Sequence, residues 1–442
     1  MKNNDELFGH PTGLFVLFFT ELWERFSYYG MRAILVFYMI TNVGSTNPGF
    51  GWSEAFALSI YGWYTMAVYL SSIPGGYLAD RHWGQKKAVL IGGLLLCAGH
   101  GILAVNTQWA FFLGLTLIVA GVGLLKPNIS TMVGGLYQRG DARRDAGFFI
   151  FYIGINMGAF LASLIVGYIG ETKGWHYGFG LAGLGMLIGQ LVYLGGQKYL
   201  VGIGDFTPVV RDVKTQHVQK LSKIERDRVF VLWLSFLINI AFWAAFEQAG
   251  GLMSIYTLQK IDRHVFGYEI PASLFQAANP LFIMMFGVLV GNFWMGRQLQ
   301  KKESSSLFKM GIGTIIMGSG FLLMAGASLE TASAATNKAS LYWLLGAYLL
   351  NTIGELCLSP VALSFVTKLA PAKYASMMMG LFFATSGLGN KVAGFIGGLA
   401  QDAGELKIFF GIFIFSVAFG LLILVFLKKL KALTHGAESG DV

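Results

Sequence analysis

The chain has 442 residues, of which 55% are hydrophobic and 12% charged, with a formal net charge of +9. Soluble proteins carry about 25% charged residues, so this composition excludes an ordinary soluble domain. Charge-free runs such as 88–125 and 270–296 are long enough to cross a bilayer, at about 20 residues per crossing. The sequence therefore predicts a polytopic membrane protein.

Apolar runs separated by charged or polar breaks predict twelve transmembrane helices. Their ranges are 12–41, 53–79, 86–104, 109–137, 145–171, 176–200, 227–257, 271–296, 307–328, 340–369, 373–401 and 405–430. The polar connector 201–226 is expected to be a linker between an N-terminal bundle of six helices (1–200) and a C-terminal bundle of six (227–442). This division indicates an all-α major-facilitator fold with alternating access by rocking of the halves. A twelve-helix protein of another fold is the alternative.

Lys and Arg residues are concentrated in one set of loops. These loops and the C-terminal tail include Arg81, Lys86, Lys87, Arg143, Arg144, Arg297, Lys301, Lys302, Lys428 and Lys429. The opposite loops hold only Lys173, Lys260, Arg263, Lys338 and Lys407. The positive-inside rule places the rich loops and both termini in the cytoplasm. Because the basic residues are dispersed along one membrane face, no nucleic-acid partner is expected.

The first predicted helix carries charged residues where a lipid-facing helix carries none. Glu21, Glu24, Arg25, Tyr28 and Arg32 lie at offsets of 0, 3, 4, 7 and 11, which places them on one helix face. A charge at the centre of a lipid-facing helix costs about 2.5–3.5 kcal/mol. The stripe is therefore expected to face other helices or a water-filled cavity, as part of an ion or proton pathway.

Eight ionisable residues lie well inside the predicted spans. Those of the N-terminal bundle sum to a formal charge of +1 and those of the C-terminal bundle to −1; they are Glu21, Glu24, Arg25, Arg32 and Lys126, and Glu247, Glu355 and Lys391. This asymmetry favours a zwitterionic substrate, with its carboxylate near Arg32 and Lys126 and its amine near Glu355. Salt bridges that only join helices are the alternative, and Lys391 can simply extend toward the outer membrane interface.

Polar and aromatic residues complete the candidate site. Three tyrosines can line a cavity, and two asparagines place amides in apolar surroundings: Tyr28, Tyr29, Tyr69, Asn156 and Asn279. A substrate backbone or a neighbouring helix could satisfy these amides. His100 is interpreted as an interhelical polar residue with a hydrogen-bond partner. Neither a metal site nor an enzyme is expected, because no ligand cluster and no nucleophile–base constellation is evident.

Five segments of the sequence carry specific motifs. The first, E-L-W-E-R-F-S-Y-Y-G (21–30), resembles the signature E-x-x-E-R-F-x-Y-Y-G of the proton-dependent oligopeptide transporter family of the major facilitator superfamily. G-L-L-K-P-N-I-S-T (123–131), D-A-G-F-F-I-F-Y-I-G-I-N-M-G-A-F (145–160), F-W-A-A-F-E-Q-A-G (242–250) and G-E-L-C-L-S-P-V-A-L-S (354–364) look like its other blocks. The resemblance implies proton-coupled import of di- and tripeptides by a protein of the bacterial inner (plasma) membrane. A monomer with no cofactor other than the coupling protons is expected.

The resemblance also implies roles for single residues. Proton coupling is expected of Glu21, Glu24, Arg25, Lys126 and Glu247. Substrate binding is expected of Tyr28, Tyr29, Arg32, Tyr69, Lys126, Asn156, Asn279 and Glu355. Glu247 is further expected to form a gating pair with the N-terminal half, with Arg32 as the candidate partner.

Two features depart from the family pattern. The 26 residues of 201–226 cannot hold the two extra helices that many prokaryotic members insert between the bundles. Phe382 stands where relatives often carry Trp, which bears on side-chain preference, and Ser386 one turn later is a candidate pocket residue.

Three other functions remain open from the residues. A carrier of nitrate or another small anion needs the basic pair but not Glu355, and a drug–proton antiporter needs the carboxylates but not Arg32 and Lys126. A non-transporting peptide sensor would lack the helix-one carboxylates. Because this chain has every member of each set, the residues favour peptide–proton symport.

Overall fold

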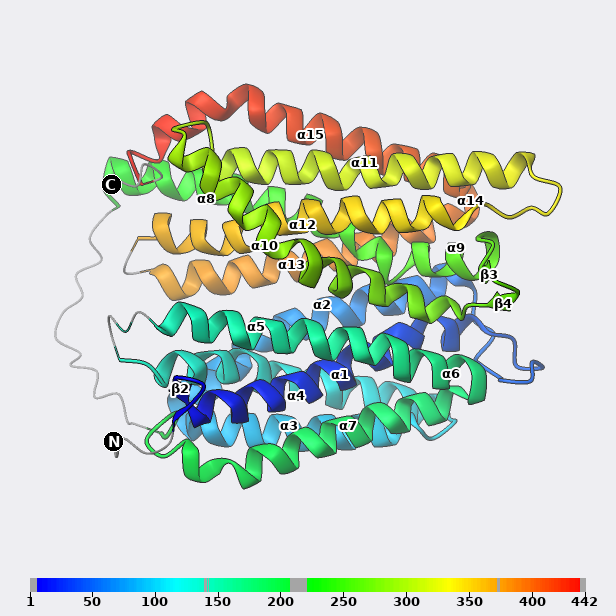
Figure 1. Ribbon diagram of the computed structural model, residues 1–442, viewed down its shortest axis with the longest axis horizontal. Coiled ribbons are helices and arrows are strands. Elements are labelled where there is room, and N and C mark those ends of the chain that lie inside the picture. The colour runs from blue at the N-terminus through cyan, green and yellow to red at the C-terminus, as the bar shows by residue number, and fades with distance from the viewer. Residues whose placement is uncertain (1–5, 139–140, 142, 207–220, 372–373, 438–442) are drawn as a thin grey trace. The chain divides into compact units, whose positions relative to one another are not determined.

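The computed structural model describes residues 6–138, 141, 143–206, 221–371 and 374–437. Contacts between Cα atoms divide the chain into two compact units. Unit 1 comprises Met1–Trp52, Ala67–Val210 and Pro271–Pro280, and unit 2 comprises Ser53–Met66, Arg211–Ile270 and Leu281–Val442. Each unit is a bundle of long helices (Figure 1).

Unit 1 begins with an antiparallel hairpin of β1 (Glu6–Leu7) and β2 (His10–Pro11). Its helices are α1 (Thr12–Ile40), the later part of α2 (Glu54–Leu78), the π-helix η1 (Ala79–Trp83), α3 (Gly84–Leu103), α4 (Gln108–Gly135), α5 (Arg143–Ala162), the π-helix η2 (Ser163–Gly167), α6 (Tyr168–Lys173), α7 (Trp175–Gly195) and the 3₁₀-helices η3 (Gln197–Tyr199) and η5 (Ala272–Ala277). Helix α1 packs against α5 and α7, and α3 packs against α4 and α7.

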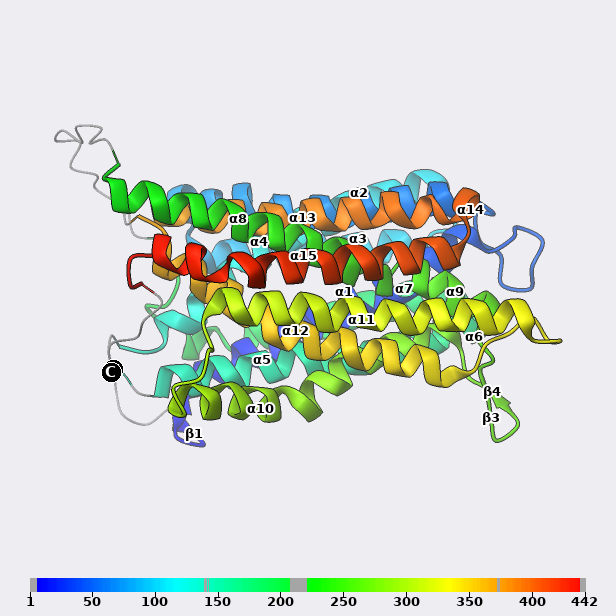
Figure 2. The same ribbon diagram turned by 90° about the horizontal axis from the view of Figure 1, so that it is seen from above.

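Unit 2 contains the early part of α2 and most of the later helices. They are α8 (Lys223–Phe246), the 3₁₀-helix η4 (Glu247–Ala249), α9 (Leu252–Lys260), α10 (Ala278–Leu299, from Leu281 in this unit), α11 (Ser306–Ser333), α12 (Leu341–Leu369), α13 (Ala375–Gly398), α14 (Ala400–Ala403) and α15 (Glu405–Leu433). Strands β3 (His264–Val265) and β4 (Tyr268–Glu269) form a hairpin after α9. Helix α11 packs between α12 and α15, and α8 packs against α13 (Figure 2).

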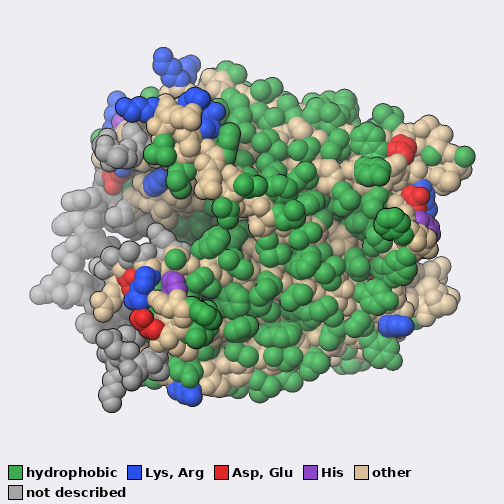
Figure 3. Space-filling model, in the orientation of Figure 1, with side chains coloured by type: hydrophobic (Ala, Val, Ile, Leu, Met, Phe, Trp, Pro, Cys, Tyr) green, Lys and Arg blue, Asp and Glu red, His purple; other side chains and the backbone are tan. Residues whose placement is uncertain are grey.

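Each predicted span overlaps helical structure, but some of them are built from successive segments: 145–171 from α5, η2 and α6, 227–257 from α8, η4 and α9, and 271–296 from η5 and α10. Nine helical segments within the described ranges are long and apolar enough to cross a membrane. Helix α1 is of similar length, but it carries four ionisable side chains. Hydrophobic side chains cover the middle of the helices in Figure 3, and Lys and Arg side chains gather near their ends. The all-α polytopic fold is confirmed, whereas the count of twelve crossings and the bundle boundaries stay predictions; residues 207–220 of the predicted linker lie outside the described residues.

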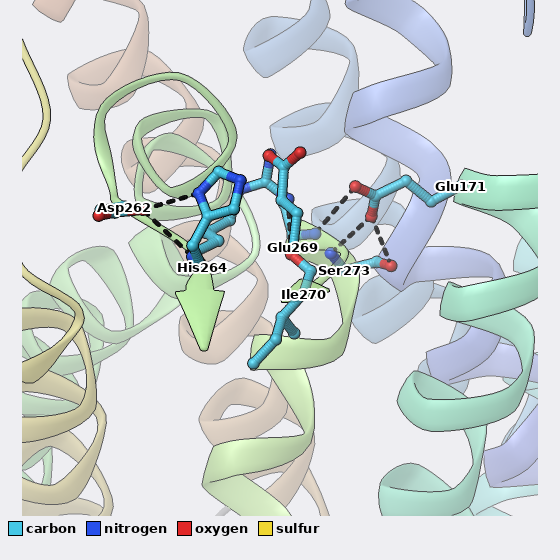
Figure 4. A network of polar contacts seen from close by, with 8 residues as sticks. Glu171, Asp262, His264, Glu269, Ile270 and Ser273 are labelled. Carbon is cyan, nitrogen blue, oxygen red and sulfur yellow. Dashed lines mark hydrogen bonds and ion pairs between the residues drawn. The ribbon is translucent and has the colours of Figure 1, made fainter. Parts of the chain in front are cut away.

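The segment before α10 is anchored by side-chain hydrogen bonds (Figure 4). In unit 1, the Glu171 carboxylate accepts from the backbone N–H groups of Ala272 and Ser273, both at 2.9 Å, and from the Ser273 hydroxyl at 2.8 Å. Glu171 therefore satisfies free N–H groups at the start of η5. Because η5 leads directly into α10, this contact fixes the position of Asn279 within unit 1.

The β3–β4 hairpin of unit 2 is held by its own polar contacts. Arg263 donates to Glu269 Oε1 and to the carbonyl of Ile270, both at 2.6 Å. His264 Nδ1 lies 2.9 Å from Asp262 Oδ1 (Figure 4). These contacts fix the turn between α9 and η5.

Candidate functional site

The charged stripe of α1 is buried in unit 1. Glu21, Glu24 and Arg25 are 2%, 0% and 3% exposed. Arg25 Nη2 donates to Glu24 Oε1 at 2.6 Å, Arg25 Nε donates to Glu24 Oε2, and Nε also lies 3.2 Å from Glu21 Oε1. Glu21 Oε2 has no hydrogen-bond partner among the described residues. The Arg25 guanidinium therefore contacts two carboxylates. It donates two hydrogen bonds to Glu24 and makes one longer contact with Glu21.

Glycines of α5 bring that helix close to the stripe. Gly154 packs against the Phe18 ring, and Gly158 packs against the Leu22 carbonyl and the Arg25 side chain. These two glycines are four residues apart and share one helix face, as in small-residue packing motifs of membrane helices. A Cβ atom at Gly158 would lie 3.1 Å from Arg25 Cβ. The G-I-N-M-G segment therefore packs along α1 beside Leu22 and Arg25.

Aromatic rings surround the cations of α1. The Arg25 guanidinium carbon lies 5.2 Å from the Tyr28 ring centre and 5.8 Å from that of Tyr29. The Arg32 guanidinium carbon lies 5.7 Å from the Tyr29 ring centre. Tyr29 and Arg32 are partly exposed, whereas Tyr28 is buried. Cation–π contacts of this kind hold both arginines along one face of α1.

Lys126 brings α4 to the same cluster. Its ammonium lies 4.6 Å from the Tyr69 ring centre, and it interacts electrostatically with Glu21, Glu24, Arg25 and Arg32. The next residue, Pro127, lacks an N–H and so leaves the Gly123 carbonyl without its usual helical donor. Gly75 of α2 packs directly against that carbonyl. The K-P-N segment therefore combines a charged side chain with a close helix contact.

Unit 2 holds a second set of buried polar residues. Glu247 is 2% exposed and accepts a hydrogen bond from the Tyr61 hydroxyl at 2.7 Å. Asn239 Nδ2 donates to Thr385 Oγ1 at 3.0 Å and to Ser386 Oγ at 2.9 Å. Trp243 Nε1 donates to Asn239 Oδ1 at 3.0 Å. Ser386 is therefore a member of a network that joins α8 to α13.

Sequence reasoning missed Tyr61 and Asn239. Asn239 lies one turn before Trp243 in an apolar span, so the argument applied to Asn156 could have found it. Tyr61 had no such signal, because tyrosines are common in this chain and its partner Glu247 is 186 residues away.

The remaining predicted residues are distributed over both units. Asn156 is buried and donates to the Tyr152 carbonyl of its own helix at 3.0 Å. Asn279 is partly exposed in unit 1 and Glu355 is partly exposed in unit 2. Lys391 lies 4.4 Å from the Trp63 ring centre. The proposed Arg32–Glu247 pair, and the binding of one substrate by both sets, join residues of different units and stay predictions.

The interpretation of His100 is wrong. This residue of α3 is fully buried, and neither ring nitrogen has a hydrogen-bond partner among the described residues. Gly183 of α7 packs against the Cβ atom and the backbone of His100, so the contact between α3 and α7 at this point is made by apolar and backbone atoms.

Among the described residues, no group of three or more His, Cys, Asp or Glu side chains lies close enough together to hold a metal ion. The polar residues instead form two buried clusters, one rich in carboxylates and cations in unit 1 and one built on Glu247 and Asn239 in unit 2. Ionisable side chains inside a helical membrane bundle mark ion, proton or substrate pathways, as in transport proteins.

Comparison with known proteins agrees with this class. The family model described as the POT family matches residues 86–201 and 204–407. The peptide transporter YePEPT of Yersinia enterocolitica is 34% identical, over 98% of this chain and 97% of the relative. A di-/tripeptide transporter of Lactococcus lactis is 33% identical, over 98% of each chain. The chain is also similar to a crystal structure of a peptide transporter POT in complex with sulfate, with 35% identity, a TM-score of 0.90, and coverage of 97% of this chain and 96% of that one.

The fold and its buried ionisable clusters therefore define a polytopic membrane transporter of the major-facilitator type. The chain belongs to the POT family, as its motifs predicted.

Proposed function

We propose that this protein is a proton-coupled symporter that imports di- and tripeptides by alternating access. The observation that carries the proposal is the buried cluster in which Arg25 serves both Glu21 and Glu24, with Lys126 in electrostatic range. Two carboxylates that share one guanidinium leave a proton-binding site whose occupancy depends on the position of nearby cations. The names of the relatives from Yersinia and Lactococcus support a peptide as the substrate.

The peptide is assigned to the residues that carry opposite charge. Arg32 and Lys126 receive its carboxylate, and Glu355 receives its ammonium group. Asn156 and Asn279 bind its backbone, and Tyr28, Tyr29 and Tyr69 line the pocket. Ser386, which accepts a hydrogen bond from Asn239, is a further candidate residue for this pocket. Glu247 pairs with the N-terminal half when the gate closes.

The remaining expectations belong to the same proposal. The protein acts as a monomer in a bacterial inner membrane, with both termini in the cytoplasm. It catalyses no covalent reaction and uses protons instead of a bound cofactor.

Uptake of labelled dialanine into liposomes that contain the purified protein tests this function. An inward proton gradient should drive accumulation above the outside concentration, and a protonophore should abolish it. Unlabelled dialanine should compete with uptake, whereas nitrate should not. Uptake of dialanine that is independent of the proton gradient, or that nitrate inhibits, would contradict the proposal.

A further inference from the structure

An apolar groove opens on the surface of unit 2. Helix α10 runs obliquely across α11 and α12 (Figure 1), and the space between them has a volume of about 440 Å³. Its walls are Leu289, Phe293, Phe308, Ile312, Ile316 and Ile353, and Arg297 is the only charged residue that lines it in the described part of the chain. Leu289 and Phe293 are 61% and 58% exposed. In a bilayer such a surface needs an apolar occupant.

The groove has a defined direction. Arg297 lies in the last turn of α10 and Phe308 in the first turn of α11, so both mark the same end. Leu289 and Ile316 each lie eight residues further into the membrane, which is about 12 Å along a helix. Half the hydrocarbon core of a bilayer is about 15 Å thick. The groove therefore spans most of one leaflet and ends at its interface.

Two cations lie at the interfacial end. The Arg297 guanidinium carbon is 5.9, 6.0 and 5.6 Å from the ring centres of Phe293, Trp294 and Phe308. The Lys309 ammonium is 5.4 Å from the Trp294 ring centre. Arg297 donates from Nε and Nη2 to the Glu303 carbonyl at 3.2 and 3.1 Å, which fixes its position and leaves Nη1 for an anion.

The charge of the adjoining turn adds to these cations. Lys301 and Lys302 are exposed in the connection from α10 to α11, and the Lys302 N–H donates to the Arg297 carbonyl at 3.0 Å. The one acidic residue of this turn is Glu303, whose carboxylate pairs with Lys431 of α15 at 2.8 Å. Its negative charge is therefore compensated, and the end of the groove stays strongly positive.

We propose that this groove holds an acyl chain of an anionic phospholipid, whose phosphate lies against Arg297 and Lys309. The apolar wall provides the contact for the chain, and the paired cations distinguish an anionic headgroup from a zwitterionic one. A guanidinium binds phosphate oxygens through several N–H groups, and a lysine adds a point charge. The site lies outside the residues assigned to the peptide and to proton coupling.

Lipid titration of the purified full-length protein in a neutral detergent tests this site. The apparent affinity follows from the dependence of the unfolding temperature on lipid concentration. Phosphatidylglycerol should bind more tightly than phosphatidylcholine of the same chain length, and inorganic phosphate should neither stabilise the protein nor compete. Equal binding of the two lipids would overturn the proposal. Competition by inorganic phosphate would reveal a general anion site instead of a lipid site, and would overturn it too.

Three variants separate the contributions. Arg297→Gln with Lys309→Gln should weaken phosphatidylglycerol binding about 30-fold, since each cation near a membrane surface contributes about a factor of five. Lys428→Gln with Lys429→Gln removes the same charge from exposed positions of α15 and should leave binding unchanged. Ile312→Trp keeps every charge but fills the groove, so it should also weaken phosphatidylglycerol binding. An equal loss in the α15 control, or an unchanged affinity in Ile312→Trp, would contradict the site.

Discussion

The Tyr61 hydroxyl donates a 2.7 Å hydrogen bond to the Glu247 carboxylate within unit 2, although the two residues are 186 positions apart. Tyr61 lies in the early part of α2, which packs with unit 2 while the later part of the helix belongs to unit 1. Gly62, the next residue, packs against the backbone of Asn390 and Lys391 in α13. This close contact places the phenol against Glu247.

Replacing Tyr61 with Phe is expected to impair transport. The change removes a donor from a buried carboxylate, which costs about 1–3 kcal/mol. We expect a lower unfolding temperature and a lower maximal rate of gradient-driven dialanine uptake, with little change in KM, because Tyr61 is not assigned to the substrate. Tyr342→Phe is the control, since that side chain is 85% exposed. Equal behaviour of the two variants would remove any role for the Tyr61 hydroxyl.

A methyl group at Gly158 is expected to destabilise the α1–α5 contact. It would collide with the Leu22 carbonyl and press on Arg25, and overpacking of this kind costs about 1–3 kcal/mol. We expect Gly158→Ala to lower the unfolding temperature and to reduce uptake together. Gly101→Ala in α3 is the control, because nothing lies within 4 Å of a Cβ atom there. It should be neutral or stabilising, since Ala favours helix over Gly.

These contacts show what the sequence could predict and what it could not. The Glu21–Arg25 pair follows from spacing, because residues four apart on a helix are neighbours whatever the tertiary fold. The glycine content and the spacing of Gly154 and Gly158 indicate close helix packing, but Leu22 as the partner emerges only from the fold.

The contacts of Glu247 and Ser386 depend on tertiary packing alone. Glu247 meets Tyr61, and Ser386 meets Asn239, across separations of 186 and 147 residues. Hydropathy decides which segments enter the membrane but says little about which helix faces meet. The prediction of a hydrogen-bond partner for His100 is wrong for the same reason, because a polar residue in an apolar span does not reveal whether a partner faces it.

The Glu303–Lys431 ion pair is expected to make the free energy of unfolding depend on pH in the acidic range. Although partial burial acts to raise the pKa of Glu303, hydrogen bonds from Lys431 and Ser305 lower it to about 2 from an ordinary 4.5. A carboxyl group whose folded pKa is depressed stabilises the fold above its unfolded pKa, and this contribution is lost as the pH falls from about 4.5 through 2. Because both side chains are about one third exposed, the contribution is at most about 1 kcal/mol.

The measurement is the unfolding temperature of Glu303→Gln and wild type between pH 7 and pH 2.5. Wild type should be the more stable at pH 7, and the gap should narrow below pH 4.5. Asp402→Asn removes a carboxylate from an exposed position of α14 and is the control. A gap for Glu303→Gln that stays constant over this range would show that the ion pair contributes nothing.

Glu355→Ala is expected to reduce peptide binding more than stability. Truncating one partner of a desolvated charge pair costs about 2–5 kcal/mol, or roughly 30-fold to several thousand-fold in affinity. An N-acetylated dipeptide lacks the ammonium group, so it should bind wild type and Glu355→Ala with the same affinity. Competition binding with both peptides gives the comparison. If free and acetylated peptides bind wild-type protein equally well, the assignment of Glu355 to the peptide amine is wrong.

Glu21→Gln and Glu24→Gln are expected to separate coupling from structure. Glu24 accepts from both Nε and Nη2 of Arg25, whereas Glu21 makes one 3.2 Å contact and has a second oxygen without a partner in the described ranges. Loss of charge at Glu24 should therefore lower the unfolding temperature more than loss of charge at Glu21, because breaking a buried ion pair costs about 3–5 kcal/mol.

Both variants should lose proton-driven accumulation of dialanine, since each removes a carboxylate that can exchange a proton as Lys126 approaches or withdraws. Counterflow of labelled against unlabelled peptide requires no net proton movement and should persist in both. If both variants still concentrate dialanine at the wild-type rate, the carboxylates are structural, and Glu247 becomes the next residue to test for coupling.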